Sequence, residues 1–149
     1  MPDVTFYWAG DGIYKDKILP ELSKFENFKW IGALEYPKNV RKFLNSIDVY
    51  GLISGIDMSP LTLQEAQLMR KPVIGTNIGG IPELMENNKT GLLVEKGNAD
   101  DLYEKIQKLI KDEDLRINFG NAGREFIESN FSWNVITQKF LENVKTVIS

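Results

Sequence analysis

Two short apolar runs, separated by a helix start, dominate the middle of this chain. Residues 48–54 lead to Gly55, and residues 72–76 lead to a Gly-Gly pair. Short apolar runs bounded by glycine are typical of buried parallel strands. The segment between them, at about residues 60–70, has the pattern of a helix. The sequence therefore predicts a strand, a helix and a second strand in succession.

The start of this predicted helix is suited to binding an anion. Ser59 occupies an N-cap position, and Pro60 follows at the first helical position, where a missing N–H is tolerated. The backbone N–H groups of Leu61 and Thr62 then have no partner within the helix, and the helix dipole adds positive potential there. The sequence therefore predicts a phosphate-binding helix terminus.

One acidic side chain, Glu65, is expected on a mainly apolar face of the same helix. The other members of that face are Leu61, Leu68 and Met69. A buried carboxylate needs a partner, and two interpretations are open. In the first, Glu65 accepts hydrogen bonds from vicinal hydroxyls, such as those of a ribose. In the second, it is satisfied by backbone N–H groups or by Arg70 or Lys71.

Strand and helix patterns alternate along the first two thirds of the chain. Alternation of this kind predicts an α/β fold with a Rossmann-like, doubly wound parallel sheet and flanking helices. Three helices and no further strand are expected after residue 94, as a C-terminal helical tail, and Asn98 is expected to cap the first of them. The predicted strands are 4–9, 28–32, 48–54, 72–76 and 91–94, and the predicted helices between them are 14–25, 37–46, 60–70 and 81–87.

Composition and charge exclude several classes of function. The 149 residues are 42% hydrophobic and 26% charged, which is ordinary for one globular domain. A net charge of −3, without a basic cluster, argues against nucleic acid as a partner. The absence of cysteine and histidine excludes disulfides, thiol catalysis, Ser-His-Asp chemistry and Cys/His zinc sites within this chain. No run of membrane-spanning length is present, and the expected location is the cytoplasm.

Six short motifs, in order along the chain, resemble those of one enzyme family. They are residues 6–12 (FYWAGDG), residues 30–34 (WIGAL), the acid pair Asp57 and Glu65, residues 71–83 (KPVIGTNIGGIPE), residues 88–94 (NKTGLLV) and residues 130–133 (NFSW). In this series the chain resembles the donor-binding, C-terminal half of a retaining glycosyltransferase of family 4, which has the GT-B fold. The resemblance covers nearly the whole chain.

The resemblance implies a role for several residues. Asp57 is expected to contact hydroxyls of the donor sugar and to position the sugar for transfer, which makes it the predicted catalytic residue. Glu65 is expected to hold the ribose hydroxyls of the nucleotide, and the N–H groups of Leu61 and Thr62 to hold its diphosphate. The other residues expected at the donor site are Met58, Ser59, Gly10, Gly32 and Ala33. Contacts to the base are expected near residues 32–34, and no cofactor or divalent metal is required.

The chain departs from the family pattern at four positions. Asp57 stands where the family usually has glutamate, so its carboxylate is one methylene shorter and the donor sugar is left open. Met58 and Pro60 stand at glycine positions, and Pro60 cannot donate an N–H to a sugar or phosphate oxygen. Arg70 replaces the glycine that closes the helix, a structural change in which its side chain is expected to bond the last carbonyls.

The same resemblance predicts that residues 1–149 are a donor-binding domain without its acceptor domain. A strand and a helix carrying an Arg and a Lys for the diphosphate are expected ahead of the first strand, and the acceptor half commonly supplies a histidine. The chain is therefore not expected to be active alone. Its expected partners are a nucleoside-diphosphate sugar and the acceptor domain of the same enzyme. A GT-B epimerase or phosphorylase, or a non-catalytic nucleotide-binding or scaffolding module, are the alternatives.

Overall fold

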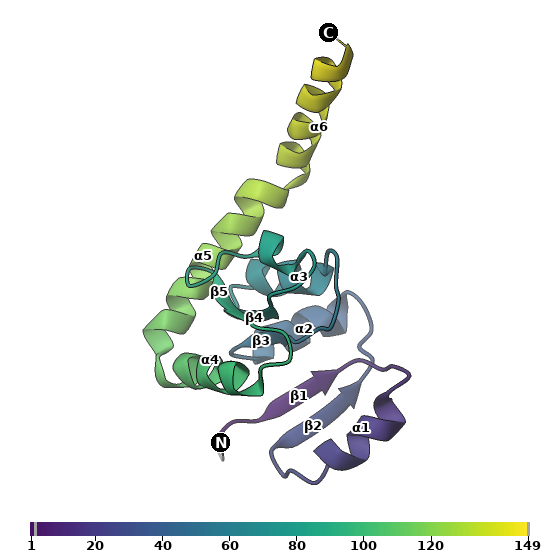
Figure 1. The fold of residues 1–149 in the computed structure, drawn as a ribbon, viewed down its shortest axis with the longest axis vertical. Coiled ribbons are helices and arrows are strands. Elements are labelled where there is room, and N and C mark those ends of the chain that lie inside the picture. Colours follow the sequence, from purple (N-terminus) through teal and green to yellow (C-terminus); the bar gives the residue numbers. More distant parts are fainter. Residues whose placement is uncertain (2, 149) are drawn as a thin grey trace. The chain divides into compact units, whose positions relative to one another are not determined.

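The fold was obtained as a computed structural model, and it describes Met1 and residues 3–148. The chain divides into two compact units, Met1–Phe43 and Leu44–Ser149. Figure 1 colours the first unit purple to blue, and the second continues through teal and green to yellow. Each unit is described by itself below.

The first unit is built on a two-stranded parallel ladder. Strand β1 (Phe6–Ala9) pairs with β2 (Phe28–Gly32), and helix α1 (Lys15–Leu22) connects them. Tyr7 on β1 contacts Phe43 edge-on, with ring centroids 6.2 Å apart. Two-stranded ladders are only marginally stable without further packing, and this aromatic contact contributes to that packing.

The second unit contains a three-stranded parallel sheet in the order β3-β4-β5. Its strands are β3 (Tyr50–Leu52), β4 (Val73–Thr76) and β5 (Gly91–Val94), and helix α2 (Lys38–Ser46) leads into it from the first unit. All four residues of the central strand β4 are buried. Helix α3 (Leu61–Leu68) connects β3 to β4, and the short 3-10 helix η1 (Ile81–Leu84) lies between β4 and β5. Burial on both faces explains why β4 is mainly apolar rather than alternating.

Three helices follow the last strand. They are α4 (Ala99–Lys111), α5 (Glu113–Phe131) and α6 (Trp133–Ile148). The side chain of Asn98 accepts a hydrogen bond from the Asp101 N–H at 3.0 Å, as the sequence predicts for an N-cap. The Asp112 carboxylate accepts a hydrogen bond from the Leu115 N–H at 2.8 Å. Asp112, in the acidic junction between α4 and α5, therefore caps the start of α5.

One apolar cluster holds the sheet of the second unit against α4 and α5. Its buried members are Ile74, Leu92, Val94, Leu109 and Phe119. Gly120 lies where α5 meets the end of α3, and a Cβ on it would stand 2.1 Å from the Arg70 carbonyl oxygen. A glycine is required at that contact because any side chain would push the two helices apart. The core therefore fixes α3, and α3 carries Leu61, Thr62 and Glu65 of the predicted site.

The α/β class with parallel strands, flanking helices and a helical C-terminal end is confirmed. The hydrogen-bonded strands nevertheless form two ladders, one in each unit, instead of the single predicted sheet. Alternation along the sequence predicts parallel crossovers, but it does not say which strands share hydrogen bonds. Over the residues that the structure describes, no helix is long and apolar enough to cross a bilayer.

Candidate functional site

The predicted acid loop follows the carboxyl end of β3. The Ser54 N–H donates to the Thr76 hydroxyl at 3.0 Å, and the Ser54 hydroxyl donates to the Ile56 carbonyl at 2.8 Å. Thr76 is the last residue of β4, so the loop is anchored at the carboxyl ends of two adjacent parallel strands. Ligands of open α/β sheets bind at this edge.

Two glycines after β4 lie directly against the acid loop. The Gly80 N–H donates to the Asp57 carbonyl at 2.9 Å. A Cβ on Gly79 would stand 2.1 Å from the Asp57 carbonyl oxygen, and one on Gly80 would stand 1.7 Å from that of Met58. A Gly-Gly pair by itself indicates only a tight turn of the chain. The structure shows that the two glycines also allow the backbone of the acid loop, which carries the predicted catalytic Asp57, to approach closely.

Helix α3 begins one residue later than predicted. Pro60 is the N-cap residue, with φ −70° and ψ 107°, and no side chain caps the helix. The predictions that Ser59 is the N-cap and Pro60 the first helical residue are therefore wrong, because Pro60 adopts extended ψ. Among the described residues, the N–H groups of Leu61 and Thr62 have no acceptor. The two predicted phosphate donors are thus available at the positive end of the helix.

Glu65 lies one turn into α3 and is half-buried. The predicted apolar face is wrong: the buried residues are Leu63, Ala66 and Gln67, whereas Leu61 is 68% exposed. Because α3 packs its other side against α5, Glu65 projects from the less buried side. Within the part of the chain that the structure describes, its carboxylate has no hydrogen bond or ion pair.

The two cations proposed as partners of Glu65 bind elsewhere. The Arg70 guanidinium donates to Asn121 Oδ1 at 2.6 Å, and Lys71 Nζ donates to the Asn45 carbonyl at 3.1 Å. Arg70 has φ 57°, and the N–H groups of Arg70 and Lys71 bond the Gln67 and Ala66 carbonyls. Arg70 closes α3 through its backbone in a Schellman motif. The prediction that its side chain bonds the last carbonyls is wrong, because that side chain reaches α5.

Tyr50 at the start of β3 was not singled out from the sequence. Its Oη donates to the Thr62 hydroxyl at 2.8 Å. Burial raises the pKa of Tyr50 above its ordinary value, and the charges of Glu65 and Asp57 raise the pKa further. Both predicted acids therefore lie within electrostatic reach of one phenol. A tyrosine in an otherwise apolar strand was the available signal, since a buried phenol usually finds a hydrogen-bond partner.

The remaining predicted site residues belong to the first unit. Gly10 and Gly32 follow β1 and end β2, and the Gly10 N–H donates to the Gly32 carbonyl at 2.7 Å. Both have positive φ, 126° and 70°, which favours glycine. The Trp30 Nε1 donates to the Gly10 carbonyl at 2.9 Å, and Ala33 follows as an exposed residue. The structure brings the two glycines together at the carboxyl edge of their ladder.

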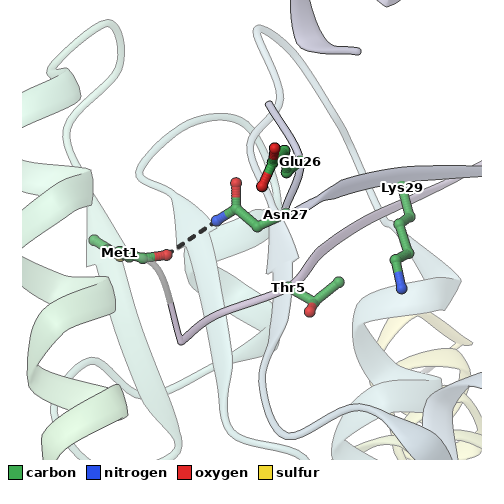
Figure 2. Close-up of a pocket in the computed structure, with 5 residues that line it drawn as sticks. All are labelled: Met1, Thr5, Glu26, Asn27 and Lys29. Carbon is green, nitrogen blue, oxygen red and sulfur yellow. Dashed lines mark hydrogen bonds between the residues drawn. The ribbon is translucent and has the colours of Figure 1, made fainter. Parts of the chain in front are cut away.

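A pocket in the first unit contains none of the predicted residues. Figure 2 shows its lining, Met1, Thr5, Glu26, Asn27 and Lys29. The Asn27 side-chain N–H₂ donates to the Met1 and Val4 carbonyls at 3.0 and 2.8 Å. Thr5 and Asn27 precede β1 and β2, so the pocket lies at the amino ends of these strands. Ligands of parallel sheets bind at the opposite, carboxyl ends.

The described residues hold no group of three or more acidic, histidine or cysteine side chains that could bind a metal ion. The second unit instead gathers two free backbone N–H groups, two carboxylates and a linked pair of hydroxyls around the start of α3. N–H groups and a helix dipole suit an anion, whereas carboxylates suit hydroxyl donors. The arrangement can bind a ligand that carries both phosphate and vicinal hydroxyls.

Known proteins share both the sequence pattern and the fold of this chain. N-acetyl-alpha-D-glucosaminyl L-malate synthase of Bacillus anthracis is 34% identical over 138 residues, which are 93% of this chain and 36% of that protein. The capsular polysaccharide biosynthesis glycosyltransferase CapM of Staphylococcus aureus is 44% identical over 75 residues, 50% of this chain and 20% of CapM. The chain thus spans less than half the length of either relative.

A solved structure is similar over the same range. A TarM variant of S. aureus, in complex with Fondaparinux, alpha-GlcNAc-glycerol and UDP, has a TM-score of 0.82 and 28% identity, over 93% of this chain and 28% of TarM. Residues 2–126 match the family described as "Glycosyl transferases group 1". That match covers most of the chain and includes every residue of the candidate site. The chain therefore belongs to the glycosyl transferases group 1 family.

Proposed function

We propose that this chain binds the nucleoside-diphosphate sugar of a glycosyltransferase that transfers the sugar to an acceptor with retention of configuration. One observation carries the proposal: over the residues that the structure describes, the Glu65 carboxylate has no partner, and it lies one turn beyond two N–H groups that have no acceptor there, those of Leu61 and Thr62. Four residues of helix correspond to roughly 6 Å along the axis. That spacing suits a ligand whose ribose and phosphate are joined by one methylene.

Each group has a distinct task in this proposal. The N–H groups of Leu61 and Thr62 hold the diphosphate, and Glu65 accepts hydrogen bonds from the ribose hydroxyls. Asp57 is held against Gly80 at the adjacent loop and binds hydroxyls of the donor sugar. Met58 and Ser59, both exposed, lie between Asp57 and the helix start and line the same site. Gly10, Gly32 and Ala33 of the first unit are proposed as further donor-binding residues.

The relatives support this class of ligand. The TarM complex contains UDP. Another relative, 30% identical over 148 residues, is named a GDP-mannose-dependent mannosyltransferase of Corynebacterium glutamicum. Different bases thus occur among proteins similar to this chain, so the proposal names a nucleoside diphosphate rather than a particular base.

The proposed chemistry is largely electrostatic. Negative charge develops on the diphosphate as the bond to the sugar breaks, and the free N–H groups of α3 stabilise that charge without reorganising. Asp57 orients the sugar toward the acceptor, which an acceptor domain of the same enzyme supplies in this proposal. The cytoplasmic location stays a prediction from the sequence.

Titration calorimetry of the 149-residue chain with UDP, GDP and ADP tests the proposal. We expect one diphosphate to bind saturably. Glu65→Gln should weaken that binding about tenfold, the effect of losing a hydrogen bond to a charged group. The 2′,3′-dideoxy form of the same diphosphate should bind wild type and Glu65→Gln equally, because it lacks both hydroxyls that the carboxylate would accept from.

The matched control is Glu104→Gln, an exposed change on α4. It should leave the affinity unchanged. Absence of binding by all three diphosphates would contradict the donor site. An equal loss for the ribose and dideoxyribose ligands in Glu65→Gln would contradict the role of Glu65 while leaving the phosphate site in place.

A further inference from the structure

The hydroxyls of Tyr50 and Thr62 form a directed pair at the proposed donor site. Tyr50 Oη donates to Thr62 Oγ1 at 2.8 Å, and the two residues come from β3 and the first turn of α3. A threonine hydroxyl has one proton and two lone pairs. Because Thr62 accepts from Tyr50, its own proton is directed to a different partner.

No acceptor for that proton is present among the described residues. A threonine within a helix commonly donates to a carbonyl three or four residues earlier, and Thr62 makes no such bond to Ser59 or Met58. Its side chain is exposed, next to its own unpaired N–H group. Thr62 therefore presents two donors, one from its backbone and one from its side chain.

The surroundings keep the Tyr50 phenol a donor. Burial and the negative charges of Glu65 and Asp57 favour its protonated form. The phenol nevertheless donates to Thr62 and to neither carboxylate. Both acids consequently keep their oxygens available for hydroxyls of a ligand, and the Thr62 oxygen carries the hydrogen bond of the phenol.

We propose that the Thr62 hydroxyl is a further phosphate-binding group of the donor site and that Tyr50 is the positioning residue that orients it. This inference rests on the proposed function. A phosphate oxygen at the start of α3 accepts from the Thr62 N–H and from the Thr62 hydroxyl. The bond from Tyr50 fixes the hydroxyl rotamer and polarises its proton toward the anion.

Titrations with UDP, GDP and ADP, each beside its nucleoside, separate this inference from the proposed function. For the diphosphate that wild type binds, Thr62→Val should weaken binding about tenfold. Thr62→Ser should restore most of it, because serine keeps the hydroxyl. Tyr50→Phe should weaken binding about threefold. Binding of the nucleoside, followed by NMR titration, should be unchanged in all three variants.

The double variant tests whether Tyr50 acts through Thr62. Adding Tyr50→Phe to Thr62→Val should weaken binding no further, since the oriented group is already gone. Tyr103→Phe and Thr137→Val, both exposed and on α4 and α6, are the matched controls. Melting temperatures of all variants identify any loss of folded protein.

The outcomes are distinguishable. If wild type binds none of the diphosphates, the proposed function fails and this inference fails with it. If wild type binds and Thr62→Val binds equally well, the inference alone is overturned. An equal loss of diphosphate and nucleoside affinity, or additive losses in the double variant, would also overturn it, because Tyr50 would then support the fold rather than the hydroxyl.

Discussion

The two ladders of this chain differ in how completely they are covered. All four residues of β4 are buried, whereas three of the four residues of β1 are exposed. Strand β4 has a hydrogen-bonded neighbour on each side, but both strands of the first unit are edges. The proposed ligand-binding groups of Asp57 and α3 are therefore supported by a buried core. Gly10 and Gly32 are supported only by the two-stranded ladder of the first unit. Because well-packed elements hold ligand-binding groups more precisely, we expect the groups of the second unit to be positioned more precisely than those of the first.

The largest expected effect comes from opening the core of the second unit. Leu109 on α4 is 0% exposed within the apolar cluster, so Leu109→Ala should cost about 3 kcal/mol of unfolding free energy. Leu19→Ala on the half-buried face of α1 should cost about 1 kcal/mol or less. Native-state amide exchange in β4 and β1 reports each unit separately.

Amide exchange in the two variants tests whether the two units differ in stability as their burial suggests. We expect Leu109→Ala to speed exchange in β4 and to leave β1 nearly unchanged. Equal acceleration in both strands would show that the units unfold together. A larger cost for Leu19→Ala than for Leu109→Ala would show that the stability of the chain does not follow the burial seen here.

A smaller but more local effect is expected at Gly80. Its φ of −86° suits any residue, so the obstacle to Gly80→Ala is the Met58 backbone, whose carbonyl oxygen would lie 1.7 Å from the new Cβ. The acid loop must move, and we expect a loss of about 2 kcal/mol in stability together with loss of nucleotide binding. Urea unfolding and calorimetry measure the two effects.

Two other glycines provide the controls for that change. Nothing lies within 4 Å of a Cβ on Gly55 in the second unit or on Gly12 in the first. Alanine at either position should change stability by about 0.5 kcal/mol or less. If Gly55→Ala were as damaging as Gly80→Ala, flexibility of the loop rather than close approach of the backbones would explain the requirement for glycine.

The smallest expected effects concern one exposed acid in each unit. The hydrogen bonds from Lys105 and from the Glu95 N–H lower the pKa of Asp101. The Gly12 N–H, followed by Lys15, lowers the pKa of Asp11. A lowered pKa in the folded state stabilises the fold above the unfolded value of about 3.9, and this contribution is lost as pH falls through the folded pKa.

Carboxyl NMR titrations between about pH 2 and pH 5 measure both groups. We expect each midpoint to lie below about 3.9, the unperturbed value. Asp101→Asn and Asp11→Asn should remove the corresponding acid dependence of stability, with only small changes because both sites are exposed to solvent. A midpoint at or above the unperturbed value for either residue would show that its hydrogen bonds do not persist in solution.

Particular residues show which structural features could be predicted from the sequence and which could not. The strand at 91–94 and the Asn98 cap were predicted as they occur, because each depends on local pattern. The helix start at Pro60 was misplaced by one residue, since a proline suits both the N-cap and the first turn. The apolar face around Glu65 was wrong because α3 is amphipathic only weakly, and the position of α5 decides which side is covered.

The amino-acid sequence by itself determined the α/β class, the order of the elements, and the placement of Asp57 before α3 and of Glu65 within it. These features follow from short-range periodicity, turn residues and capping. Tertiary structure decided which strands pair, why Gly79 and Gly80 are needed, and that Tyr50 reaches Thr62. Those depend on approaches between segments far apart in the chain, where packing and hydrogen-bond geometry, rather than local propensity, set the outcome.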